Sequence, residues 1–144
     1  MFGIIVVGHG SFAPGITSSV KMISGELRHY IPLEFLEEEA LEALPQKLHA
    51  AIDELLKDTQ GVLIFTDLIG GTPFKTAYTI AHGREDLAVI CGTNLGMLLE
   101  ANLARSDGGT LQDLARSIVE GGREQVIFME KIVTTTSQEL EEGD

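Results

Sequence analysis

The sequence has little cysteine and no long apolar run. Only one of its 144 residues is cysteine, Cys91, so no disulfide can form within the chain. No apolar stretch approaches the roughly 18 residues that a membrane-spanning helix needs. The N-terminus enters an apolar, strand-like run directly, without the basic segment that begins a signal peptide. These absences predict a cytoplasmic protein without a transmembrane helix.

Basic residues are also scarce. Ten Lys and Arg stand against 22 Asp and Glu, and the formal net charge is −12. Nucleic acids and anionic membranes bind basic patches, so the sequence predicts no nucleic-acid partner and favours basic protein partners. The plainer interpretation, that many soluble proteins are acidic, stays open. Four scattered histidines and one cysteine lack the spacing of metal ligands, and neither a metal nor a cofactor is predicted.

What the chain does have is a regular alternation of strand-like and helix-like segments. Short apolar runs rich in β-branched residues indicate strands, and apolar residues spaced three or four apart indicate helices. The predicted strands are 2–8, 31–36, 61–67, 87–91 and 125–133. The predicted helices are 11–28, 45–57, 72–82, 95–105 and 110–120.

This alternation predicts one α/β domain over residues 1–133, with helices on both faces of a doubly wound, mainly parallel sheet. Pro32 marks the second strand as an edge strand, and the strand order 2-1-3-4 would put the first and third strands side by side. Three residues are expected to cap helices: Thr72, Asn94 and Thr110. Residues 134–144 are polar and acidic and are expected to form a mobile tail.

The stretch Gly8-His9-Gly10 lies where the first predicted strand ends and a helix begins. Open α/β sheets bind ligands at this carboxyl edge, and the free N–H groups at a helix start favour an anion such as phosphate. A histidine between two glycines is uncrowded, so His9 is a candidate nucleophile. The plainer alternative is a strand-end histidine that bonds a backbone carbonyl.

Asp67 ends the third predicted strand. Adjacent strands lie about 4.8 Å apart, so its carboxylate could accept a hydrogen bond from His9, fix the imidazole tautomer and stabilise a positively charged ring. This arrangement suits a histidine that accepts a phosphoryl group. Alternatively, Asp67 caps a turn. Four candidate phosphate-binding residues border the same crevice: Gly10, Ser11, Gly71 and Thr72.

The other three histidines have structural interpretations. His29 and His82 are expected at helix ends, where a positive side chain interacts favourably with the helix dipole. His49 is expected on a helix. None of the three is predicted to carry a phosphoryl group.

Two stretches resemble the signature segments of a known family. The strand that leads into Gly8-His9-Gly10, and the sequence Thr-Asp-Leu-Ile-Gly-Gly-Thr-Pro-Phe over 66–74, are similar to those of one group of bacterial proteins. This group is the IIA component of the mannose/fructose/sorbose family of the phosphoenolpyruvate-dependent sugar phosphotransferase system. Three further stretches match: 89–95, 98–100 and 120–124. The resemblance covers nearly the whole chain.

The resemblance implies a phosphotransferase. His9 would take a phosphoryl group from the carrier protein HPr and pass it to a IIB subunit, which serves the membrane subunits IIC and IID. Asp67 would hydrogen-bond His9, and Thr72 would contact the phosphate. The resemblance also implies a cytoplasmic homodimer that exchanges a C-terminal antiparallel strand. The mannose branch often has threonine directly after the aspartate, where this chain has Leu68.

Three other functions stay open at this point. The pattern G-x-G-x-x-A over 8–13 fits a loose dinucleotide-binding fingerprint, with Glu34 or Glu37 as the acid that would bind ribose. A receiver-like domain would carry the phosphoryl group on Asp67, although such domains need acidic residues after the first strand to hold Mg²⁺. The third is a phosphorylation-controlled regulatory domain of the same fold.

Overall fold

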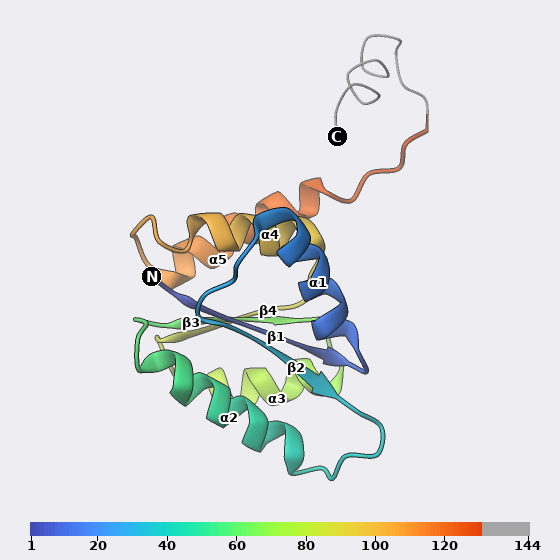
Figure 1. Cartoon of the computed structure of the whole chain (residues 1–144), viewed down its shortest axis with the longest axis vertical. Helices are drawn as coiled ribbons and strands as arrows, with labels where there is room; N and C mark the ends of the chain where they lie inside the picture. The colour runs from blue at the N-terminus through green and yellow to red at the C-terminus, as the bar shows by residue number, and fades with distance from the viewer. Residues whose placement is uncertain (131–144) are drawn as a thin grey trace.

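A computed structural model describes residues 1–130, and it contains a parallel sheet between two layers of helices (Figure 1). The strands are β1 (Gly3–His9), β2 (Tyr30–Phe35), β3 (Val62–Thr66) and β4 (Leu87–Ile90). They pair in the order β2-β1-β3-β4. The helices are α1 (Phe12–Ser24), α2 (Ala43–Leu56), α3 (Thr72–Ala81), α4 (Leu95–Ala104) and α5 (Leu111–Glu124). The predicted α/β class and strand order are therefore confirmed.

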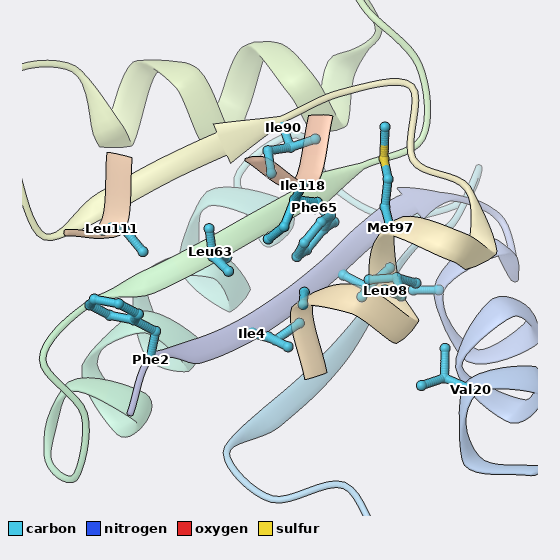
Figure 2. Close-up of a cluster of buried hydrophobic side chains, with 13 residues drawn as sticks. Phe2, Ile4, Val20, Leu63, Phe65, Ile90, Met97, Leu98, Leu111 and Ile118 are labelled. Carbon is cyan, nitrogen blue, oxygen red and sulfur yellow. The ribbon is translucent and has the colours of Figure 1, made fainter. Parts of the chain in front are cut away.

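The side chains of β1 divide the core into two halves because they alternate between the faces of the sheet. Ile4 and Val6 pack with the layer of α1, α4 and α5, and Ile5 and Val7 pack with the layer of α2 and α3. Figure 2 shows the first half, where side chains of β1 and β3 meet those of α4 and α5. Both faces of the sheet are covered, which explains why its central strands are apolar throughout. Within residues 1–130, no helix is both long and apolar enough to cross a bilayer.

Helix α1 ends earlier than the spacing of its apolar residues predicts. It stops at Ser24, because Gly25 adopts a left-handed φ of 80° and its N–H donates to the carbonyl of Lys21. The prediction that His29 lies at a helix end is therefore wrong. His29 lies in the loop before β2 with a φ of 50°.

The helix caps agree with the sequence at two of three positions. Asn94 accepts a hydrogen bond from the N–H of Met97, and Thr110 accepts one from the N–H of Asp113. Thr72 is not a cap, because the extended residue before α3 is Gly71. Thr72 is instead the first residue of the helix.

The strand predicted over 125–133 is wrong for the part that the structure describes. Helix α5 continues to Glu124, Gln125 forms a turn, and residues 126–130 have no regular secondary structure. A strand needs a neighbour for its backbone hydrogen bonds, and nothing in residues 1–130 of one chain pairs with this segment. Four apolar side chains consequently remain 51–83% exposed: Val126, Ile127, Phe128 and Met129. Residues 131–133 and the tail predicted over 134–144 lie outside the described residues.

Arg105 joins the segments at the amino edge of the sheet. Arg105 is 3% exposed, and its guanidinium donates to the carbonyls of Phe2 (3.4 Å), His29 (3.0 Å) and Arg28. It also donates to the side-chain oxygen of Asn102 at 3.0 Å. Burial lowers the pKa of Arg105, yet its hydrogen bonds offset much of the cost of removing this charge from water.

Candidate active site

The residues at the carboxyl ends of β1 and β3 meet, as the strand order predicts. Nδ1 of His9 lies 2.7 Å from Oδ2 of Asp67, and the backbone N–H of His9 donates to the same oxygen at 2.9 Å. The N–H of Leu68 donates to the other carboxylate oxygen at 2.9 Å. Because a carboxylate only accepts hydrogen bonds, we assign the imidazole proton to Nδ1 and a free lone pair to Nε2.

The electrostatics of the pair favour an ionised carboxylate. Burial raises the pKa of Asp67, but the hydrogen bonds from the backbone and ring of His9 and from the N–H of Leu68 outweigh burial. The net result is a pKa below the ordinary value. The Asp67 side chain is 12% exposed and that of His9 is 45% exposed. The site thus combines a fixed negative charge with an accessible imidazole.

Asp67 is anchored through the residue before it. The hydroxyl of Thr93 donates to the carbonyl of Thr66 at 2.7 Å, and the hydroxyl of Thr66 donates to the carbonyl of Ile90 at 3.1 Å. Both threonines are buried. These bonds join the end of β3 to the end of β4, so the chain is fixed where Asp67 begins.

Gly71 lies against the imidazole ring. A Cβ atom at this position would be 2.8 Å from Cε1 of His9 and 3.5 Å from Nε2. Glycine is therefore required for the close approach of the ring to the start of α3. The first N–H groups of a helix have no partner within the helix and favour anions.

The other predicted phosphate-binding residues also lie at this edge. Ser11 precedes α1, and its hydroxyl makes no capping bond to that helix. Thr72 begins α3 with an exposed side chain. Gly10 has a left-handed φ of 56°, and its N–H donates to the carbonyl of Phe35 at 2.7 Å. Its N–H is thus engaged within the protein, and Gly10 contributes open space to the crevice.

One residue of the site, Phe35, was not predicted, and Glu37 was considered only as the ribose-binding acid of the dinucleotide alternative. Phe35 is the register partner of His9, and its ring meets the imidazole edge-on with 5.7 Å between centroids. Phe35, Glu37, His9 and Gly10 line a hollow of about 430 Å³. The signal that could have found Phe35 is the parallel pairing of the first two strands, which sets their last residues side by side.

Two of the alternative functions fit this geometry less well. The space above Gly8 is occupied by Phe12, because a Cβ at Gly8 would lie 2.6 Å from Cδ2 of that ring. The glycine therefore serves internal packing instead of leaving room for a pyrophosphate. Asp67 has both oxygens hydrogen-bonded and is less exposed than His9, which makes His9 the better phosphoryl acceptor.

Comparison with known sequences relates the whole site to one family. The family model described as "PTS system fructose IIA component" matches residues 3–119. The mannose-specific EIIAB component of the PTS system of Escherichia coli (strain K12) is 37% identical over 123 residues. That match covers 85% of this chain, which spans 38% of the length of the relative. The sorbose-specific EIIA component of Lacticaseibacillus casei is 29% identical over 136 residues, which are 94% of this chain and 96% of the relative.

Solved structures give the same result. The phosphotransferase system component EIIA from Streptococcus agalactiae has a TM-score of 0.81 and 30% identity, and the match covers 90% of this chain and 98% of that one. The mannose/sorbose specific IIA subunit from Enterococcus faecalis has a TM-score of 0.80 and 28% identity, with 92% and 97% covered. The chain therefore belongs to the mannose/fructose/sorbose family of phosphotransferase-system IIA components.

Proposed function

We propose that this protein is a phosphoryl carrier of a sugar phosphotransferase system, which accepts a phosphoryl group from HPr on His9 and passes it to a IIB component. The observation that carries this proposal is the His9–Asp67 pair. A carboxylate with a lowered pKa holds Nδ1 at 2.7 Å, and the imidazole is exposed beside the start of α3. Membership of the IIA family supports the same role.

The pair suits a nucleophilic transfer. Nε2 of His9 attacks the phosphorus atom, and an N–P bond forms as the bond between phosphorus and the donor breaks. The electron pair of the broken bond returns to the donor. The proton stays on Nδ1, where Asp67 stabilises the positive charge that the ring acquires. In transfer to IIB, a nucleophile of IIB forms a bond to phosphorus as the N–P bond breaks, and the electron pair of the broken bond returns to Nε2.

The phosphoryl oxygens would be held by donors at the starts of two helices. Gly71 and Thr72 contribute backbone N–H groups at the start of α3, and Thr72 adds its hydroxyl. Ser11 adds a second hydroxyl at the start of α1. Gly10 keeps this space free of a side chain. Such preorganised donors stabilise the charge that develops during transfer.

The proposed carrier role also implies where the protein acts and which subunits it works with. The IIA domain comprises residues 1–133 and acts in the cytoplasm, and IIB connects it to the membrane subunits IIC and IID. The protein is a homodimer in which residues 125–133 pair with the second copy. Two features support exchange: β4 is an edge of the described sheet, and a groove of about 460 Å³ lies between β4 and α5. Deletion of residues 124–144 should give a monomer or an aggregate in light scattering, and a stable dimer would contradict exchange.

Phosphoryl mapping tests the function directly. The protein is incubated with phosphorylated HPr, and the acid-labile phosphate is located by mass spectrometry at alkaline pH. We expect label on His9 alone. The His9→Gln variant should melt like the wild type and lose all label, and the matched controls His29→Gln, His49→Gln and His82→Gln should keep it. Label retained by His9→Gln would overturn the proposed function.

A further inference from the structure

We propose that Lys47 and Glu39 are positioning residues for His9 and that they act through Phe35. The inference rests on the proposed function of His9 as the phosphoryl acceptor. It assigns a role in transfer to an ion pair that contacts neither His9 nor Asp67 directly.

The two side chains form a compact bridge between the loop after β2 and helix α2. Nζ of Lys47 lies 2.6 Å from Oε1 of Glu39 and also donates to the carbonyl of Glu34 at 2.8 Å. The same carboxylate oxygen accepts the N–H of Leu36 at 3.1 Å. The side chains are 34% and 15% exposed, so solvent screens this bridge less than a fully exposed pair.

The bridge holds the peptide groups on both sides of Phe35. The carbonyl of Phe35 points toward β1, where it accepts the N–H of Gly10. Since backbone groups alternate along a strand, the carbonyl of Glu34 and the N–H of Leu36 point the other way. In the described sheet β2 is an edge strand, so no further strand bonds these two groups there. Lys47 and Glu39 supply the missing partners.

Phe35 transmits this restraint to His9. Its ring meets the imidazole edge-on at 5.7 Å, and its carbonyl fixes the residue that follows His9. Asp67 holds the imidazole at Nδ1 only, which leaves rotation about the Nδ1–Oδ2 contact unrestrained by that bond. Phe35 on one side of the ring, together with Gly71 beside Cε1, limits this rotation and so restricts the direction of Nε2. Direction matters because the phosphorus atom must lie in line with the attacking lone pair.

An ion pair at the C-terminal end of α2 provides a matched control. Lys57 and Glu54 form an i,i+3 pair with side chains 69% and 64% exposed. Among residues 1–130, Lys57 has no hydrogen bond from its ammonium to a backbone carbonyl near the site. Removal of the ammonium from Lys57 therefore changes the net charge as much as its removal from Lys47, without loosening Phe35.

The test compares three variants: Lys47→Met, Lys47→Arg and Lys57→Met. Phosphoryl transfer from phosphorylated HPr through this protein to a IIB acceptor in excess is measured over a range of HPr concentrations to separate kcat from KM. The ring ¹H and ¹⁵N signals of His9, assigned with His9→Gln, are recorded on the same samples. We expect Lys47→Met to lower kcat about tenfold with little change in KM, because misorientation weakens the transfer step. It should also shift the His9 ring signals. Lys47→Arg should recover most of the rate, and Lys57→Met should match the wild type.

The route through Phe35 is tested by a double-variant cycle. Phe35→Leu alone should shift the His9 signals and lower kcat. Addition of Lys47→Met to Phe35→Leu should then have no further effect on either, because the restraint has already been lost. Effects that simply add would overturn the route through Phe35.

The remaining outcomes also decide the proposal. A Lys47→Met protein that melts earlier but keeps the wild-type kcat and His9 signals would overturn it. If Lys47→Met does not fold, Glu39→Gln keeps an acceptor for Leu36 and loses the charge; unchanged His9 signals in this variant would overturn the proposal. If the wild type accepts no phosphate from HPr, the proposed function fails, and the ring signals still decide whether Lys47 positions His9.

Discussion

The polar side chains at the two edges of the sheet differ in their exposure to solvent and in their hydrogen bonds. At the amino edge, Arg105 is 3% exposed, and its two terminal guanidinium nitrogens donate to three backbone carbonyls and one side chain. At the carboxyl edge, the side chain of His9 is 45% exposed, and of its two ring nitrogens only Nδ1 has a hydrogen bond within residues 1–130. A buried charge must be satisfied by the protein itself, whereas an oriented group that stays open is available to a ligand. The comparison thus separates a residue that holds the fold from one that, under the proposed function, performs transfer.

Loss of the carboxylate at Asp67 should have the largest effect, and this effect should be a slower phosphoryl transfer. Asp67→Ala removes the group that fixes the tautomer of His9 and stabilises its positive charge. We expect the transfer rate from phosphorylated HPr to fall by roughly 10²–10⁴, the scale for a positioned acid–base partner. Circular dichroism should show an intact fold. A wild-type rate in this variant would make Asp67 a structural residue and remove the contrast between the edges.

Loss of Arg105 should have a smaller effect, and this effect should be a lower free energy of unfolding. Arg105→Met leaves the carbonyls of Phe2, Arg28 and His29 without the guanidinium. The carbonyl of His29 keeps the N–H of Ile4 as a donor, but the carbonyls of Phe2 and Arg28 lose the guanidinium. A buried acceptor that loses its donor costs about 1–3 kcal/mol, so the free energy of unfolding should fall by that order. Denaturant titration measures the loss. The transfer rate per folded molecule should stay at the wild-type value, and a selective loss of transfer would show that the two edges are coupled.

The smallest expected effect is the dependence of the free energy of unfolding on acidic pH. The folded-state pKa of Asp67 is lowered from 3.8, so its ionisation stabilises the fold fully above the unfolded pKa. This stabilisation is lost as the pH falls through the folded-state pKa. We therefore expect the difference in unfolding free energy between wild type and Asp67→Asn to shrink from pH 7 to pH 3. A difference that does not change with pH would show that the charge of Asp67 adds nothing to stability.

The sequence predicts the site better where strands end than where they pair. His9 and Asp67 were predicted as neighbours because apolar runs mark the strand ends and the alternation of elements suggests the strand order. Phe35 was missed because its contact with His9 depends on the register of an edge strand. Arg105 was missed because two of its partners lie 76 and 103 residues away, beyond any local pattern.

The wrong final strand has a different cause. Apolar alternation over 125–133 predicts a segment that suits a strand, but it does not name the neighbour that the strand needs. In one chain, Val126 and Phe128 are at least 80% exposed, and no strand forms over residues 126–130. For this segment, the alternation of apolar residues predicts that a strand is possible, but it does not predict which strand would pair with it.

The close approach of Gly71 to the His9 ring has a kinetic consequence under the proposed function. Asp67 bonds Nδ1 and Gly71 lies close to Cε1, so Nε2 is the one ring nitrogen left for both the donor and the acceptor protein. Donor and acceptor proteins must then occupy the same place in turn and exclude one another. Under the proposed function, the carrier should follow a ping-pong scheme without a ternary complex, and unphosphorylated HPr in excess should compete with IIB for the loaded protein.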